Sequence, residues 1–340
     1  MGALMSTNSF PVEGRTILIT GGSRGTGLEA GRQLAAKGAN VVIVARDQKR
    51  LQEGIEYISA GAASPETQRF HQISADMTGA ETCASVMAEA TAWNSGSPPD
   101  IVWCCAGSPQ PTMFIETDVS QFQEQMDSNY FSSAYMAHAA LRTWLKPATG
   151  EVTQVGKGDT PLKRPVPRHL IFTSSFLALY PVAGYSPYSP SKAALRSLSD
   201  SLSQEVQLYA AANPHSPPVR VHTVFPATIF TESYEGENRI KSDLTKMLEE
   251  ADGGQTAEVV ARKSIQGLES GHELITCDLI TRFVMCSTLG ASVRGGFMKG
   301  LIDTFLSWLG LIVMVFVRGD MDRKVRSWGK RYGDSGMKTQ

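Results

Sequence analysis

The sequence predicts an α/β protein with one doubly wound parallel sheet and an apolar C-terminal extension. Two observations predict this fold. Short apolar runs of strand length alternate with longer segments of helical periodicity, which is typical of parallel sheets. The first of these runs, residues 15–20, leads directly into a cluster of glycines and then into a helical segment. A strand, a glycine-rich turn and a helix form the opening unit of a Rossmann-type sheet.

The glycine-rich loop has the sequence Gly-Gly-Ser-Arg-Gly-Thr-Gly over residues 21–27. Glycines let a backbone approach a pyrophosphate, and a helix N-terminus offers that group free amide hydrogens and partial positive charge. The glycine spacing is wider than in the Gly-x-Gly-x-x-Gly fingerprint, but the strand and the helix around it support the same function. The loop predicts a dinucleotide site that includes Gly21, Ser23, Arg24, Gly25 and Gly27.

The next strand, residues 40–45, ends at Arg46, and Arg50 follows one helical turn later. Arginine at this position accommodates the 2′-phosphate of NADP, whereas an acidic residue binds the ribose hydroxyls of NAD. With Arg24 in the loop, three guanidinium groups favour NADPH. Asp47 is the alternative, because a shift of one residue would make it a ribose ligand and favour NAD.

A third strand, residues 69–74, precedes Asp76 and Met77, which are expected near the adenine. Asp76 has a second interpretation as the N-cap of the helix that follows Ala80. A long helix is predicted over residues 119–146. Its Asn129 is a candidate to hold a proton-relay water, with a structural role as the alternative.

Tyr188 and Lys192 are four residues apart, and two prolines at 187 and 190 mark the start of a helix. Their side chains therefore lie one turn apart on one face. A nearby ammonium group is expected to lower the pKa of the phenol, so Tyr188 could act as a general acid toward a carbonyl oxygen. Ser175, at the end of the strand 169–174, is expected to hydrogen-bond that oxygen. Ser174 is the alternative, because neighbouring strand residues point in opposite directions.

Three further segments complete the predicted sheet region. Residues 146–168 have many prolines, glycines and charges but no periodicity, which predicts a flexible insertion. Residues 226–231 follow the strand 219–225 and form a turn at the carboxyl edge of the sheet, where ligands bind in such folds. The charged, helix-prone residues 234–250 predict a mobile lid over a substrate pocket.

Taken together, these motifs resemble the short-chain dehydrogenase/reductase family over about residues 14–232. The residues that carry the resemblance are Thr20-Gly21-x-x-x-Gly25-x-Gly27, Asp76, Cys105-Ala106-Gly107, Asn129, Ser175 and Tyr188-x-x-x-Lys192. The chain departs from the family pattern at Cys104-Cys105, where the family usually has two asparagines, and at Ala227, where it usually has glycine. The first departure leaves the local hydrogen bonding open.

Within that family the sequence is most similar to the reductases of 3-oxosphinganine. The resemblance implies NADPH-dependent reduction of the C3 ketone on the cytosolic face of the endoplasmic reticulum. It also implies that Tyr188 donates the proton, that Lys192 orients the nicotinamide ribose, and that Ser175 holds the carbonyl oxygen. Two other functions stay open: a membrane-associated steroid or retinoid dehydrogenase of the same family, and a non-catalytic NADP-binding sensor.

The predicted domain organisation is an N-terminal tail over residues 1–14, a catalytic domain over 15–272, and a membrane-associating region with a basic tail over 273–340. Residues 304–317 are uncharged and are followed at once by a basic cluster, Arg318, Arg323, Lys324, Arg326, Lys330 and Arg331. Fourteen uncharged residues are fewer than the roughly 20 that cross a bilayer, and Asp303 precedes them. With a second apolar stretch at 274–293, the sequence favours a re-entrant hairpin or a helix lying in the membrane interface. The alternative is a helix that closes a pocket or a dimer interface in a soluble enzyme.

Net charge and cysteine spacing limit the kinds of partner that the chain is expected to bind. The net charge is −1, so no basic surface indicates nucleic acid as a partner. The five cysteines show no spacing typical of a metal site or a disulfide framework, and no metal is expected. The expected partners are a long-chain lipid ketone and a membrane surface. The sequence leaves the oligomeric state open, with a homo-oligomer among the arrangements that it allows.

Overall fold

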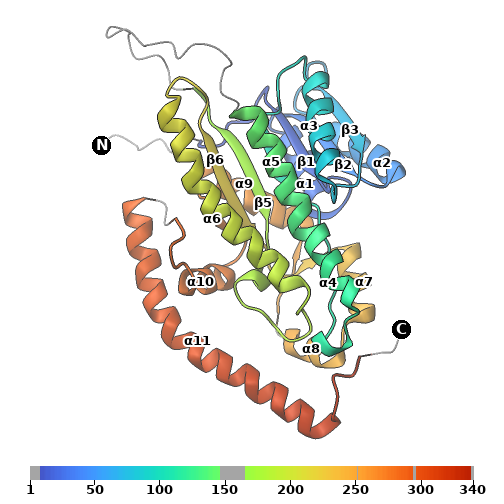
Figure 1. Ribbon diagram of the computed structural model, residues 1–340, viewed down its shortest axis with the longest axis vertical. Helices are drawn as coiled ribbons and strands as arrows, with labels where there is room; N and C mark the ends of the chain where they lie inside the picture. Colours follow the sequence, from blue (N-terminus) through green and yellow to red (C-terminus); the bar gives the residue numbers. More distant parts are fainter. Residues whose placement is uncertain (1–7, 146–164, 251, 294–295, 338–340) are drawn as a thin grey trace.

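A parallel sheet forms the centre of the computed structural model, with helices on both faces and one long helix along the outside (Figure 1). The structure describes residues 8–145, 165–250, 252–293 and 296–337. The seven strands have the order β3-β2-β1-β4-β5-β6-β9, and every pairing is parallel. They are β1 (Thr16–Thr20), β2 (Asn40–Ala45), β3 (Phe70–Ser74), β4 (Ile101–Cys104), β5 (Arg168–Thr173), β6 (Val219–Phe225) and β9 (Leu274–Thr276). The predicted doubly wound α/β fold is confirmed.

Strand order explains where a ligand site forms. The chain builds β1, β2 and β3 outward to one edge and then returns to place β4 on the other side of β1. The loops that follow β1 and β4 therefore leave in opposite directions, and a crevice opens at the carboxyl ends of these strands.

The central strands are apolar because both faces of the sheet are covered. In β1, Leu18 belongs to one buried cluster while Ile17 and Ile19 belong to the other, as alternation along a strand requires. One face is covered by α3 (Ala80–Trp93), α5 (Ser132–Trp144) and α6 (Tyr188–Ala212). The other is covered by α1 (Gly25–Ala35), α2 (Gln48–Ser59) and α9 (Ala257–Glu269).

The helix predicted over residues 119–146 is divided into three parts. It consists of α4 (Val119–Met126), a π-helical turn (Asp127–Phe131) and α5. Such turns insert one extra residue per turn and re-aim the side chains within them. The predicted insertion falls mostly on residues 146–164, which lie outside the described residues, and β5 begins at Arg168.

The catalytic fold extends beyond both predicted boundaries. Phe10 and Val12, placed in the predicted N-terminal tail, are buried in the same cluster as α9. At the other end, β9 pairs with β6, so the sheet continues past the boundary predicted at residue 272. Both runs are too short to show a periodicity from which these packing partners could be predicted.

The remaining elements surround the carboxyl edge of the sheet and the outside of the molecule. Near this edge lie two 3-10 turns, two short strands and two helices: Phe114–Glu116, Phe176–Ala178, β7 (Ile229–Phe230), β8 (Gln255–Thr256), α7 (Glu232–Ile240) and α8 (Asp243–Glu249). The C-terminal part contains α10 (Leu279–Ser287) and α11 (Phe297–Tyr332). In Figure 1, α11 begins near α10, runs along the outside and ends near α8.

Candidate active site

A cavity of about 1280 Å³ opens at the carboxyl edge of the sheet. It is lined by most of the residues that the sequence singled out: Gly21, Ser23, Arg24, Gly25, Gly27, Arg46, Arg50, Asp76, Met77, Ser175, Tyr188 and Lys192. Asn129 does not line the cavity and lies behind its wall. The cavity continues past the catalytic residues to Leu279 and Ile280 of α10.

The glycine loop forms the floor at the phosphate-binding end. Gly21 has φ +68°, and a Cβ there would lie 2.8 Å from the Ala106 amide nitrogen, so only glycine fits. The next helix, α1, begins without a capping side chain, because Arg24 at its N-cap makes no cap hydrogen bond. The first residues of α1, Gly25 to Gly27, line the cavity with no side-chain cap on the helix, and this cradle fits a pyrophosphate.

The arginines at the ends of β2 and α2 differ in their partners. Arg46 is exposed and forms a long ion pair of 4.0 Å with Asp76. Arg50 donates two hydrogen bonds, of 2.8 and 2.9 Å, to the Glu232 carboxylate. Asp47, the alternative ribose ligand, accepts a hydrogen bond from the Arg50 amide at 3.0 Å and so caps α2. The Arg46 side chain is 77% exposed and that of Arg50 is 37% exposed, so Arg46 is the more accessible of these two arginines to an incoming phosphate.

Asp76 stabilises a turn and does not cap the next helix. Its carboxylate accepts hydrogen bonds from the amide and the hydroxyl of Thr78, at 3.1 and 2.9 Å. The N-cap of α3 is Gly79. The alternative interpretation of Asp76 as a helix N-cap is therefore wrong, because the chain makes one more turn before the helix begins.

Tyr188 and Lys192 face each other, as their spacing predicted. Tyr188 is the first residue of α6, and the Lys192 Nζ lies 5.8 Å from the centre of its ring. Lys192 donates a hydrogen bond of 2.9 Å to the Thr173 carbonyl oxygen at the end of β5. Burial lowers the pKa of Lys192 to about 8, because the buried ammonium group has little to offset its desolvation.

The pKa of Tyr188 departs from its usual value in the opposite direction to our expectation. Burial is the largest influence and raises it, a hydrogen bond from Ser175 lowers it, and the nearby charge of Glu237 raises it again. The expected lowering by Lys192 is not seen, because that ammonium group is directed to the Thr173 carbonyl. The phenol keeps its proton, which suits a proton donor.

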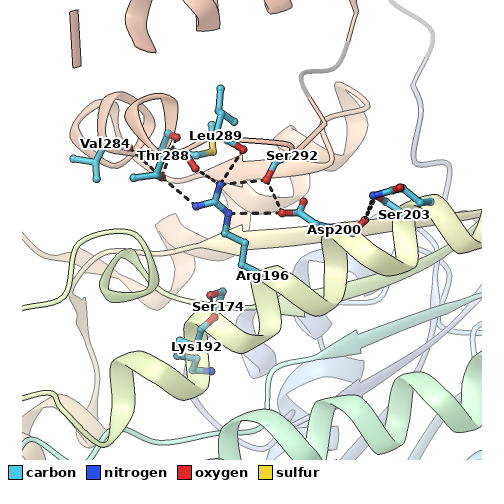
Figure 2. Close-up of polar contacts among 11 residues, drawn as sticks. Ser174, Lys192, Arg196, Asp200, Ser203, Val284, Thr288, Leu289 and Ser292 are labelled. Atoms are coloured by element: carbon cyan, nitrogen blue, oxygen red, sulfur yellow. Dashed lines mark hydrogen bonds and ion pairs between the residues drawn. The ribbon is translucent and has the colours of Figure 1, made fainter. Parts of the chain in front are cut away.

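The two neighbouring serines point to different partners. Ser174 donates a hydrogen bond of 2.8 Å to the Lys192 carbonyl oxygen and so ties β5 to α6 (Figure 2). Ser175 accepts a hydrogen bond from the Leu177 amide at 3.1 Å and hydrogen-bonds the Tyr188 phenol. Both serines line the cavity, but Ser175 is the one whose hydroxyl contacts the Tyr188 phenol.

Asn129 positions the loop that follows β4. Its side chain donates to the Ser108 and Gln125 carbonyl oxygens at 3.1 Å and accepts from the Ser108 amide at 3.0 Å. A Cβ on Gly107 would collide with the Asn129 amide oxygen and lie 3.2 Å from the Lys192 Nζ. Asn129 and Lys192 thus approach each other across a residue that must be glycine. A proton-relay role for Asn129 stays a prediction.

Thr173 replaces the hydrogen bonding left open by the Cys104-Cys105 sequence. Its hydroxyl donates to the Cys105 sulfur at 3.3 Å and accepts from the Trp103 indole nitrogen at 3.0 Å. Burial raises the pKa of Cys105 to about 12, so this thiol stays neutral. We did not single out Thr173 from the sequence, although it binds both Cys105 and Lys192. Tyr185 and Glu237, which also line the cavity, were missed as well.

Comparison with known proteins identifies the family to which this fold and active site belong. The sequence pattern described as short chain dehydrogenase matches residues 15–166 and 161–241. The chain belongs to the short-chain dehydrogenase/reductase family. It is 47% identical over 334 residues to a protein of Aspergillus fumigatus named 3-ketodihydrosphingosine reductase ksrA, covering 96% of this chain and 88% of the relative. A Neurospora crassa protein named 3-ketodihydrosphingosine reductase gsl-3 is 42% identical, with 98% and 87% covered.

Solved structures of short-chain dehydrogenases share the fold. A dehydrogenase/reductase from Sinorhizobium meliloti is 25% identical with a TM-score of 0.60, covering 80% of this chain and 96% of that one. A short-chain enzyme from Mycobacterium ulcerans is 20% identical with a TM-score of 0.61, covering 78% and 89%. The family and the fold imply an oxidoreductase with a nicotinamide nucleotide cofactor. The glycine loop and the uncapped start of α1 fit that group.

Proposed function

We propose that this enzyme reduces the C3 ketone of 3-oxosphinganine, also called 3-ketodihydrosphingosine, to sphinganine with NADPH in sphingolipid biosynthesis. The observation that carries the proposal is the similarity, over nearly the whole chain, to two relatives whose names give this reaction. The cavity supports it, because Ser175, Tyr188 and Lys192 lie together in a space that also reaches an apolar surface.

Each catalytic residue has a separate task in this proposal. The nicotinamide, when bound, supplies the hydride to the ketone carbon. Tyr188 donates a proton to the ketone oxygen, and Ser175 hydrogen-bonds the same oxygen as negative charge develops on it. Lys192 orients the nicotinamide ribose, toward which its buried ammonium group is available in the cavity.

A substrate panel tests the proposed reaction against its alternatives. We expect NADPH consumption with 3-oxosphinganine and little with steroid ketones or retinal, because the motifs alone are shared by dehydrogenases of all three classes. Turnover restricted to a steroid or to retinal would contradict the proposed substrate. Cofactor binding without turnover of any of these compounds would favour a non-catalytic sensor.

The preference for NADPH rests on Arg24, Arg46 and Arg50 at one end of the cavity. We expect Arg46→Ala to raise the KM for NADPH by about tenfold, the size of one lost charge-assisted hydrogen bond, and to leave the KM for NADH nearly unchanged. Lys49→Ala is the matched control, because Lys49 is an exposed cation in the first turn of α2, just after Arg46, and does not line the cavity. Equal losses for both cofactors would argue against a 2′-phosphate contact.

Membrane association is supported by the distribution of polar and apolar residues around α11. The residues that α11 buries are polar or small: Asp303 and Gly310 are buried, and Ser307 donates a hydrogen bond to the Cys286 carbonyl oxygen. Its outward side carries large apolar residues, with Phe305, Trp308, Leu311, Ile312, Val315 and Phe316 all more than 60% exposed. Helices of water-soluble proteins show the reverse pattern. Of the described helices, α11 is long and apolar enough to cross a membrane.

Contacts at its two ends favour α11 lying in the membrane interface. Near its start, Asp303 pairs with Lys299 at 2.5 Å and with Arg282 of α10 at 3.4 Å. Beyond its end, Ser335 accepts a hydrogen bond from the Leu244 amide of α8 and donates to Glu116. Because both ends contact the same body, a helix of this kind cannot place them on opposite sides of a bilayer. The basic residues at its end suit an anionic cytoplasmic leaflet.

A lipid surface at α11 also explains how a long-chain ketone reaches Tyr188. The cavity extends to Leu279 and Ile280 of α10, which are 82% and 73% exposed beside α11. An acyl chain could enter there without crossing water. We place the enzyme at the endoplasmic reticulum with its catalytic domain in the cytosol, which protease protection of sealed microsomes would test.

Flotation with liposomes of phosphatidylcholine and phosphatidylserine tests the surface. We expect the double substitution Trp308→Glu and Ile312→Glu to reduce bound protein about tenfold or more, because charges on the lipid side are costly. Leu208→Glu, at an exposed apolar residue of α6, is the control that should bind as the unmodified chain does. Unchanged flotation of the double variant, or dissociation of a dimer in its place, would favour the soluble alternative.

A further inference from the structure

A group of charged residues from α7 and α8 faces the catalytic cavity without a task in the proposed reaction. Glu237 of α7 and Glu249 of α8 both line the cavity, together with Tyr185. Tyr185 is buried and hydrogen-bonds these carboxylates. Lys241, at the end of α7, completes the group.

The charges of this group do not balance. The Lys241 Nζ lies 2.6 Å from the Glu249 carboxylate, and its side chain is only 1% exposed. Lys241 also acts on Glu237, but more weakly than burial does, so the pKa of Glu237 is raised to about 7. One ammonium group thus stands against two carboxylates, and the nearby Asp252 carboxylate, which also lines the cavity, adds further negative charge. A half-buried carboxylate without its own cation is unfavourable, so Glu237 takes up a proton unless a ligand supplies the missing positive charge.

Glu237 is close to the reacting end of the cavity. Its charge is near enough to raise the pKa of the Tyr188 phenol. Tyr185 links the two residues, because it hydrogen-bonds Glu237 and its ring centre lies 6.0 Å from that of Tyr188. A ligand group next to the carbonyl that Tyr188 protonates would therefore come within reach of Glu237.

We infer that Glu237 is a specificity-determining residue that binds the ammonium group of an α-amino ketone. This inference rests on the proposed function, because 3-oxosphinganine carries an amino group on the carbon next to its ketone. An ammonium group has three donors and suits a carboxylate acceptor. It supplies the positive charge that the group of Lys241, Glu237 and Glu249 lacks. Steroid ketones and retinal have no such cation.

Paired substrates test this inference. The first substrate is 3-oxosphinganine, and the second is the same ketone without its amino group, 1-hydroxyoctadecan-3-one. We expect the unmodified enzyme to show a higher kcat/KM for the amino ketone. Glu237→Gln should lower kcat/KM for the amino ketone about ten- to hundredfold, as loss of a hydrogen bond between charged groups does, and change that for the second ketone little.

The control variant is Glu235→Gln, on the same helix but exposed and outside the cavity, which should leave both values unchanged. Glutamine still accepts a hydrogen bond from Tyr185, and thermal unfolding of each variant checks that the fold is kept. Equal losses on both ketones, or no loss on either, would overturn the role of Glu237 while leaving the proposed reaction intact. An unmodified enzyme inactive on both ketones would overturn the proposed function and this inference with it.

Discussion

The sheet and the outer helix α11 bury opposite kinds of side chain. In β1, Ile17, Leu18 and Ile19 are fully buried. In α11, Asp303 is fully buried while Trp308 is 76% exposed. Helices of the same chain cover both faces of the sheet, so its apolar residues are shielded from water. The apolar side of α11 has no such cover among the described residues, which is why we assign that cover to lipid.

The two regions also use buried charge differently. In the active site, the Lys192 ammonium group donates to one carbonyl oxygen among the described residues, which leaves donors for a ligand. Within α11, the Asp303 carboxylate is paired with both Lys299 and Arg282. We therefore assign Lys192 to ligand binding, whereas Asp303, with its two cationic partners, fastens α11 to α10.

The largest effect expected from this comparison is on catalysis. Tyr188→Phe should lower kcat about 10²- to 10⁴-fold, because it removes the proton donor, and should leave NADPH affinity nearly unchanged. Tyr180→Phe is the control from the side of α11: the Tyr180 hydroxyl is buried without a hydrogen-bond partner among the described residues, and its ring packs in the cluster that includes Leu306. Steady-state kinetics and cofactor titration measure both. Retained turnover by Tyr188→Phe would refute the proton-donor role.

Matched isoleucine substitutions compare the stability of the two regions. Ile19→Ala should lower the free energy of unfolding by about 2 to 5 kcal/mol, since it leaves a cavity between sheet and helices. Ile312→Ala, at a residue that is 61% exposed, should change it by less than about 0.5 kcal/mol in buffer. Urea unfolding of the lipid-free chain provides both values. A large loss for Ile312→Ala would show that α11 packs against protein on its outer side.

Removing the buried carboxylate tests how α11 is fastened. Asp303→Ala should cost about 1.5 to 3 kcal/mol, because two charge-assisted hydrogen bonds disappear while Lys299 and Arg282 can still reach water. Amide exchange in the first turns of α11 should speed up with it. Asp322→Ala breaks a more exposed pair with Arg318 on the same helix and should cost about 1 kcal/mol or less. Equal exchange in the two variants would contradict the fastening role.

Acid should weaken the sheet through two stacked histidines. Burial lowers the pKa of His169 to about 2 and that of His222 to about 4, and their ring nitrogens lie 3.0 Å apart. Unfolded histidine titrates near pH ~6.5, so the unfolded chain binds protons first as pH falls. Stability is therefore full above pH ~6.5 and declines toward pH 4, by about 1.4 kcal/mol per pH unit for each histidine.

Urea unfolding from pH 7.5 to 4.5 measures this decline. His222→Gln should flatten the profile, and the exposed His138→Gln should not. No histidine occurs in residues 297–332, so α11 contributes no histidine of its own to the acid effect. An unchanged slope in His222→Gln would rule out the buried pair as its source.

Spacing along the chain was enough to predict the elements whose chemistry depends on neighbouring residues. The glycine loop, the strand 40–45 and the register of Tyr188 and Lys192 depend on residues a few positions apart, and the structure shows them as predicted. Fourteen uncharged residues and a basic cluster likewise indicated an apolar C-terminal segment, although the helix that contains them is longer, Phe297–Tyr332.

The direction of each side chain and its surroundings, in contrast, depend on how distant elements pack together. The packing of α6 distinguishes the two serines, because Ser174 donates to the Lys192 carbonyl oxygen whereas Ser175 hydrogen-bonds the Tyr188 phenol. Tertiary packing reversed the expected pKa change of Tyr188, since burial depends on distant elements. It also brought Glu237, 49 positions from Tyr188 in the sequence, into the same cavity. The burial of a residue and the charge around it depend on neighbours that are distant in the sequence, so spacing along the chain cannot predict them.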